Sequence, residues 1–282
     1  MKKVLTLALV ALMGLSANAQ DLPQPSPSAN VMQRVGLTDV EITYSRPAMR
    51  GRTIFGDLVP FGEMWRTGAN KATAISFSTD VEIEDQKVEA GTYSLFTIPN
   101  KDSWTIILNK NTELWGVDGY SEDMDVIRFE VAPEKGMKLE SMRISVENVS
   151  NDGADIVIAW AETQARFGIK VNTAEMAMAN IEAALAADDA TYRTYLNAGN
   201  YYLRNNLDAA QALEYCKTAI EMNDENWYAQ FVYAQALAAN GMNNEAEEAA
   251  MEAKEMGLKT AEAAGESFNY GPMIDAFVEG ME

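Results

Sequence analysis

The sequence contains no histidine and a single cysteine, Cys216, among its 282 residues. Without histidine, neither a Ser-His-Asp nor a Cys-His catalytic set can form, and zinc sites that use imidazole are excluded. One cysteine also excludes an internal disulfide and a thiolate metal cluster. The remaining chemistry is that of carboxylate pairs, of Lys, Tyr or Ser-Lys sets, and of oxygen-ligated calcium or magnesium. From the sequence we assign no catalytic residue, no metal site and no cofactor.

Basic residues are scarce as well. The chain has 22 Lys and Arg against 42 Asp and Glu, which gives a formal net charge of -20 at pH 7. Nucleic acid and anionic membrane surfaces both require a basic footprint on their partner. The charge balance therefore disfavours both classes of partner.

Long hydrophobic runs are also missing, and the longest one lies at the N-terminus. Lys2 and Lys3 precede ten apolar residues, 4–13, and Ala17-Asn18-Ala19 supplies a small-residue cleavage pattern. A membrane span needs about 20 apolar residues. We therefore expect a signal peptide over residues 1–19, cleavage after Ala19, and a periplasmic or secreted protein without a membrane span.

Residues 20–30 are rich in proline and serine and predict a tether, whereas residues 31–171 predict a β domain. Hydrophobic residues alternate with polar ones in eight short segments of this domain, and turn residues separate the segments. Asn151-Asp152-Gly153 predicts a hairpin with a type I′ turn, because Asp-Gly accepts positive φ angles. Strands without intervening helices indicate an antiparallel β-sandwich or a partly closed barrel. The eight segments are 40–45, 72–78, 81–84, 91–99, 103–109, 125–132, 142–149 and 154–171.

Residues 172–282 are rich in alanine and predict a helical domain. Pairs of alanines seven residues apart begin at Ala177, Ala212 and Ala246, so successive pairs are 35 and 34 residues apart. This spacing resembles the tetratricopeptide repeat (TPR), in which small residues let two helices approach closely. We expect an α+β multidomain protein with a short TPR-like array of α-hairpins, closed by a capping helix over residues 271–280. The alternative is a generic alanine-rich helical bundle.

One segment, residues 45–73, differs from the rest of the acidic chain. Its four arginines and one lysine outweigh Asp57 and Glu63, which gives a local charge of +3. Apolar residues in it need burial, so we expect an ordered loop that folds onto the β domain. Arginine offers a planar fork of donors that suits carboxylate or phosphate, and tryptophan can stack on a sugar. The candidate site residues for an anionic or glycan ligand are Arg46, Arg50, Arg52, Trp65, Arg66, Asn70 and Lys71. The alternative is that these arginines pair with carboxylates of the same chain.

A second candidate site lies in the predicted repeats. A groove between repeat helices can hold an extended peptide, by polar contacts to its carboxylate and by aromatic contacts to its side chains. The candidate groove residues for a peptide or protein partner are Arg193, Asn197, Asn200, Tyr228 and Phe231.

Several motifs in and beyond the basic loop carry a family resemblance. They are Ser45-Arg46-Pro47, Gly51-Arg52, Ile54-Phe55-Gly56, Leu58-Val59-Pro60, Trp65-Arg66-Thr67-Gly68-Ala69-Asn70, Ala72-Thr73, Ala90-Gly91-Thr92-Tyr93-Ser94-Leu95 and Trp115-Gly116. With them, residues 30 to 170 resemble the family catalogued as domain of unknown function 2911 (DUF2911). The resemblance implies bacterial export and a β fold, and it implies no activity.

Our first hypothesis for the function is an exported binding or adaptor protein without enzymatic activity. The β domain would hold the ligand, and the repeat groove would hold a peptide or protein partner. One alternative is a glycan hydrolase that uses two carboxylates about 5–10 Å apart. The other is a purely structural envelope protein, in which Arg46, Arg52 and Arg66 would be buried in ion pairs.

Overall fold

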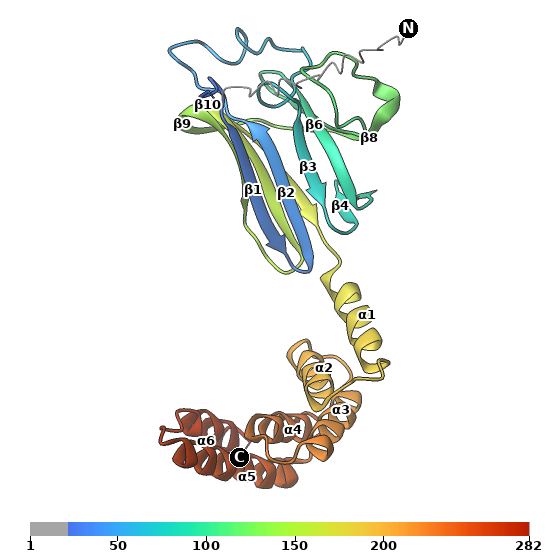
Figure 1. Ribbon diagram of the computed structural model, residues 1–282, viewed down its shortest axis with the longest axis vertical. Coiled ribbons are helices and arrows are strands. Elements are labelled where there is room, and N and C mark those ends of the chain that lie inside the picture. Colours follow the sequence, from blue (N-terminus) through green and yellow to red (C-terminus); the bar gives the residue numbers. More distant parts are fainter. Residues whose placement is uncertain (1–21, 282) are drawn as a thin grey trace, which may run out of the picture. The chain divides into compact units, whose positions relative to one another are not determined.

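The computed structural model describes residues 22–281 (Figure 1). The predicted signal peptide, residues 1–19, lies outside the described residues. The chain divides into two compact units, of which the first ends at Val171 and the second begins at Asn172. Each unit is described by itself.

The first unit contains two antiparallel sheets, and neither closes into a barrel. The six-stranded sheet has the order β1-β2-β3-β6-β7-β8, and the four-stranded sheet has the order β5-β4-β10-β9. The strands are β1 (Ser28–Val35), β2 (Thr38–Ser45), β3 (Thr73–Phe77), β4 (Val81–Ile83), β5 (Gln86–Val88), β6 (Gly91–Pro99), β7 (Trp104–Asn109), β8 (Asp125–Val131), β9 (Glu134–Glu147) and β10 (Gly153–Lys170), with a short 3-10 helix at Glu122–Met124 before β8.

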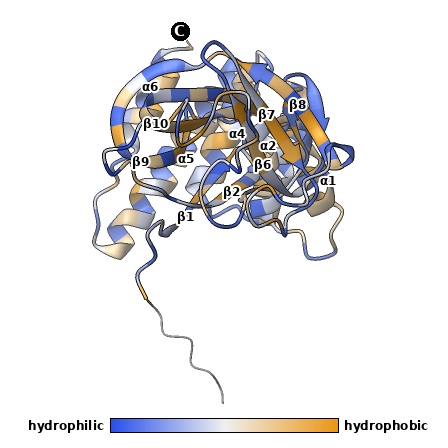
Figure 2. Ribbon diagram, turned by 90° about the horizontal axis from the view of Figure 1, so that it is seen from above, coloured by the Kyte–Doolittle hydropathy of each residue, from blue (hydrophilic) through white to orange (hydrophobic). Residues whose placement is uncertain are grey.

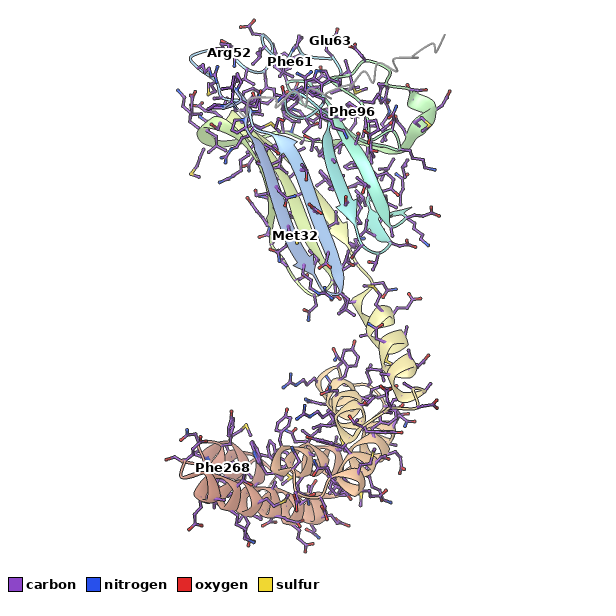
Figure 3. The ribbon with its side chains drawn as sticks, viewed as in Figure 1. Met32, Arg52, Phe61, Glu63, Phe96 and Phe268 are labelled. Atoms are coloured by element: carbon purple, nitrogen blue, oxygen red, sulfur yellow. The ribbon has the colours of Figure 1, made fainter. Side chains whose placement is uncertain are left out.

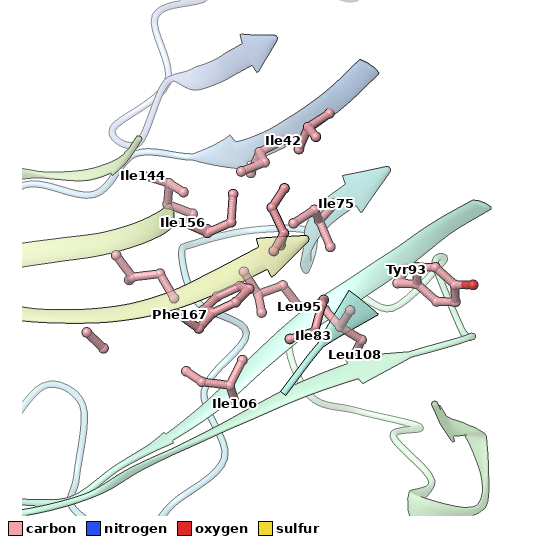
Figure 4. Close-up of a cluster of buried hydrophobic side chains, with 14 of the residues drawn as sticks. Ile42, Ile75, Ile83, Tyr93, Leu95, Ile106, Leu108, Ile144, Ile156 and Phe167 are labelled. Carbon is pink, nitrogen blue, oxygen red and sulfur yellow. The ribbon is translucent and has the colours of Figure 1, made fainter. Parts of the chain in front are cut away.

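One hydrophobic core joins the two sheets. In β2 every second residue is buried, because successive side chains of a strand point to opposite faces. Hydrophobic and hydrophilic residues also alternate in β8, from Ile127 to Val131 (Figure 2). Ile42, Ile75 and Leu95 of the larger sheet lie in one buried cluster with Ile144 and Ile156 of the smaller one (Figure 4). The two sheets therefore bury their inner faces against each other.

All eight segments predicted as strands form strands, but the predicted tether is partly wrong. β1 begins at Ser28, inside residues 20–30, because Ser28 to Val35 pair with β2 along their whole length. The predicted type I′ turn is also wrong. The connection between β9 and β10 has its positive φ at Asn148, and Gly153 is needed instead for close approach to the carbonyl of Ile169.

The second unit is helical throughout. Its helices are α1 (Thr173–Leu185), α2 (Tyr192–Arg204), α3 (Ala209–Met222), α4 (Trp227–Ala239), α5 (Asn243–Ala264) and α6 (Gly271–Glu279). α2 packs against α3, and α4 packs against both α3 and α5. The helix predicted over residues 271–280 is confirmed as α6. None of these helices, nor any other in residues 22–281, is long and apolar enough to cross a membrane.

Small residues let the helices of the second unit approach closely. Ala212, Ala219, Ala246 and Ala253 are fully buried, whereas Ala184 of the first pair is exposed. A Cβ atom at Gly199 of α2 would lie 2.4 Å from the Sγ atom of Cys216 of α3. Burial in this contact raises the pKa of the Cys216 thiol to about 12. Cys216 therefore acts as a small apolar packing residue.

Replacing Gly199 with alanine should destabilise the second unit. Alanine normally stabilises a helix interior by about 1 kcal/mol relative to glycine. Here the clash with Cys216 should outweigh that gain, since overpacking costs about 1–3 kcal/mol. Urea unfolding followed by helical circular dichroism should show the loss, and Cys216→Ala should partly relieve it in the double variant. A more stable Gly199→Ala variant would contradict the close packing of α2 on α3.

Candidate functional site

The basic loop joins β2 to β3 and pairs with both sheets of the first unit (Figure 1). Near its start, Ala48 forms a bridge with Ser141 of β9 in the smaller sheet. Further along, Trp65 forms a bridge with Thr97 of β6 in the larger sheet, with N–O distances of 2.7 and 2.9 Å. The expectation of an ordered loop folded onto the β domain is confirmed.

An aromatic cluster fixes this loop between the sheets. The Trp65 ring stacks on Trp160 of β10, with centroids 6.0 Å apart, and lies edge-on to Trp104 of β7. Phe55 packs edge-on against all three tryptophans. Aromatic pairs in these arrangements add about 0.5–1.5 kcal/mol each beyond their burial. The cluster therefore holds the loop firmly at the end of the core.

The backbone after Trp65 adopts an unusual conformation. Thr67 has a φ of 52°, a region that β-branched residues rarely occupy, and its side chain is fully buried. The hydroxyl of Thr73 donates to the Thr67 carbonyl at 2.7 Å, and the Trp65 indole donates to the Gly68 carbonyl at 3.0 Å. Strain of this kind costs about 1–3 kcal/mol and concentrates at functional sites. In this protein the strained residue, Thr67, follows Arg66 directly.

A pocket of about 340 Å³ opens beside the loop. Arg52 and Arg66 line it, and Glu63 is the one carboxylate among the described lining residues. Figure 3 shows Arg52 and Glu63 at the same end of the first unit. The other lining residues are Ser26, Pro47, Leu58, Val59, Pro60, Met64, Trp65, Gly68, Ala69, Val117 and Trp160. The pocket thus combines two cations and one carboxylate with several apolar side chains.

Neither arginine of the pocket has a carboxylate within 4 Å in residues 22–281. Arg52 is exposed, and its Nε and one Nη donate to the carbonyls of Met49 and Ala48 at 2.9 and 2.7 Å. The Nε atom of Arg66 is buried and has no hydrogen-bond partner among the described residues. The pocket therefore contains positive charge that these residues do not neutralise.

Four other candidates of the basic loop have structural roles outside the pocket lining. Arg46 donates to the Met142 carbonyl at 2.7 Å, and Arg50 donates to the Pro25 carbonyl at 2.8 Å. Asn70 donates to Ser45 at 3.2 Å, and Lys71 pairs with Glu113 at 3.2 Å. Within the described part of the chain, none of the four arginines forms an ion pair, so the alternative that they pair with carboxylates of the same chain is wrong there. Backbone carbonyls take that place for Arg46, Arg50 and Arg52.

A second loop, residues 110–124, connects β7 to β8 and contributes Val117 to the pocket lining. Gly116 has a φ of 77°, and a Cβ atom there would lie 3.4 Å from Nη1 of Arg66. The amide of Gly116 donates to the Asn70 carbonyl at 3.1 Å, so the two loops are directly joined. The Tyr120 hydroxyl donates to Asp125 at 2.7 Å. Burial and this hydrogen bond raise the pKa of Tyr120, which keeps the phenol neutral.

The candidate groove residues of the second unit are only partly brought together. Asn200 donates to the Tyr228 hydroxyl at 3.2 Å. Arg193 and Asn197 are exposed, and Arg193 donates to Tyr192 at 3.1 Å. Phe231 exposes only 2% of its surface and packs against Phe277, so its expected place on a groove surface is wrong. The buried face of α4 needs a large side chain at this position.

Sequence reasoning identified three pocket residues and missed others. Arg52, Trp65 and Arg66 belong to an unusual basic segment, which made them visible. Val117 and Trp160 lie far from that segment and reach the pocket only through the pairing of strands. No sequence signal singled out either residue.

Comparison with known proteins assigns the family. The family model described as "Protein of unknown function (DUF2911)" matches residues 26–169, slightly more than half of the chain. The chain belongs to the DUF2911 family. The matched region contains both sheets and the pocket of this DUF2911 domain. No curated protein and no solved structure matched the chain.

Replacement of the charged side chain should destabilise the folded protein at Arg46 and should not destabilise it at Arg66. Arg46→Met should lower the free energy of unfolding by about 1–3 kcal/mol, because the buried Met142 carbonyl loses its partner. Arg66→Met should leave it unchanged or raise it, because a buried donor without a partner is removed. Urea unfolding of both variants without ligand measures the difference. Equal destabilisation would show that Arg66 has a structural role.

Proposed function

We propose that this DUF2911 protein is an exported binding protein whose β domain holds a small anionic ligand in the pocket between Arg52 and Arg66. The observation that carries the proposal is the side chain of Arg66. Its Nε is buried without a partner in an acidic chain whose described carboxylates all lie more than 4 Å from its guanidinium. Arg66 as a whole is half-buried, but a buried N–H group without a hydrogen-bond partner is costly. An anion bound in the pocket would remove that cost.

The geometry of the pocket suits such a ligand. An arginine fork can donate two parallel hydrogen bonds to a carboxylate or phosphate. The Thr67 strain and the Trp65 cluster fix the backbone on both sides of Arg66 before any ligand arrives. Preorganisation of this kind lowers the cost of binding.

Binding without catalysis fits the lining better than glycan hydrolysis does. Hydrolysis needs two carboxylates on opposite sides of the scissile bond. Glu63 is the single carboxylate among the described lining residues, and histidine is absent from the whole chain. The purely structural alternative expects ion pairs of Arg46, Arg52 and Arg66, and residues 22–281 contain none of them.

The second unit supports a role as an adaptor. We infer that α2 to α5 form TPR-like hairpins, since Gly199, Ala212, Ala219, Ala246 and Ala253 are buried in the helix contacts at the repeat spacing. Arg193, Asn197, Asn200 and Tyr228 remain the candidate contacts to a peptide or protein partner. The N-terminal sequence supports export to the periplasm or beyond.

Titration of the mature chain, residues 20–282, with acetate, benzoate, phosphate and sulfate tests the proposal. At least one anion should bind at low ionic strength, as measured by calorimetry. Arg66→Gln should weaken that binding by about tenfold to a hundredfold, because hydrogen bonds to charged groups contribute about 1.5–3 kcal/mol.

The matched control is Arg143→Gln. The Nε of Arg143 is also buried without a partner among the described residues, but Arg143 does not line the pocket. Its replacement should leave anion binding unchanged. Failure of every anion to bind, or equal binding by Arg66→Gln and the wild type, would overturn the proposal.

A further inference from the structure

We propose that the ligand of the pocket is an amphipathic anion, with an anionic head at Arg66 and an alkyl or aryl body against an exposed apolar rim. This inference rests on the proposed function and adds the chemical class of the ligand. The apolar rim consists of Leu58, Phe61, Trp115 and Val117, which expose 42, 37, 69 and 37% of their surface. Leu58 and Val117 also line the pocket.

The apolar rim lies next to the charged group. Trp115 and Val117 flank Gly116, the residue whose Cβ position would be 3.4 Å from Nη1 of Arg66. Leu58 approaches from the other loop and lines the same pocket as Arg66. Phe61 packs over Gly56 of that loop, where a Cβ atom would lie 2.7 Å from the ring. An anion held by Arg66 would therefore have apolar side chains beside it.

The backbone of the apolar rim is fixed, although its side chains are exposed. Trp115 forms a bridge with Lys71, and the Val117 carbonyl accepts from the Tyr120 amide at 3.1 Å. The amide of Leu58 donates to the Thr53 carbonyl at 3.3 Å. Exposed apolar groups that are gathered at one place usually mark a binding surface. Here Leu58 and Val117 line a pocket that already contains positive charge, and Phe61 and Trp115 lie near them along the two loops.

Apolar side chains also form part of the pocket lining itself. Val59 and Trp160 are buried apolar residues, and Met64 and Pro60 add further apolar wall. An inorganic anion would lose water against these side chains without gaining donors from them. An alkyl or aryl group would instead gain about 25 cal/mol for each Å² of apolar surface that it buries. The volume of about 340 Å³ suits one small molecule.

A series of straight-chain carboxylates tests the inference by calorimetry on residues 20–282. Affinity should rise by about fourfold for each buried methylene from acetate through butyrate to hexanoate. Hexanol should bind at least tenfold more weakly than hexanoate, because it lacks the anion. Hexyl phosphate is also an amphipathic anion and should bind. Its affinity relative to that of hexanoate shows whether the pocket prefers a phosphate or a carboxylate head group.

One variant and a matched control test the contact with the alkyl or aryl body of the ligand. Trp115→Ala should flatten the rise of affinity with chain length and leave acetate binding unchanged. Hexanoate should alter the tryptophan fluorescence of the wild type, and the part of the change that comes from the exposed Trp115 should be lost in Trp115→Ala, whereas the part that comes from the lining residues Trp65 and Trp160 should remain. The control is Met32→Ala on β1, an exposed apolar residue outside the pocket lining (Figure 3). It should preserve the whole series.

The outcomes distinguish this inference from the proposed function. If acetate binds as tightly as hexanoate and Arg66→Gln abolishes both, the anion site stands and the amphipathic ligand is wrong. If hexanol binds as tightly as hexanoate and Arg66→Gln has no effect, both proposals are wrong. Equal chain-length dependence in Trp115→Ala and the wild type would contradict the assigned role of the apolar rim.

Discussion

The burial of Trp65 is the constraint on which the pocket depends. Its ring lies between Trp160 of one sheet and Trp104 of the other, and its backbone pairs with Thr97. Because Arg66 follows directly, the same contacts that bury the indole also set the position of the guanidinium. The left-handed conformation at Thr67 then turns the chain back toward β3. The segment of backbone that packs Trp65 into the core therefore also positions Arg66 in the pocket.

The arginines of the basic loop illustrate how one residue type serves two purposes. Arg46, Arg50 and Arg52 donate to carbonyls and join the loop to itself and to neighbouring segments. Arg66 gains no such bond at Nε. Proteins often give up stability at positions that serve function, and a buried N–H group without a partner on a half-buried arginine is one form of that loss. In an acidic chain with 42 carboxylates, the lack of a carboxylate near Arg66 among residues 22–281 is informative.

Much of the fold could be predicted from alternation and spacing, since these follow from the period of strands and helices. The strand of Val40 to Ser45 and the buried Ala212 and Ala246 are examples. The different roles of the arginines could not be predicted from the sequence. Their hydrogen-bond partners are backbone carbonyls, which every residue carries. Trp160 was missed for another reason. Only the pairing of strands brings it beside Trp65, which is 95 positions earlier in the chain.

The most direct test of the Arg66 site is NMR of arginine side chains. In protein labelled with 15N-arginine, the Nε–H signal of Arg66 can be assigned by its loss in Arg66→Lys. Titration with hexanoate should shift this signal and slow its exchange with water, while the Arg143 signal stays in place. Binding of hexanoate without any change at Arg66 would contradict the central claim that this side chain holds the ligand.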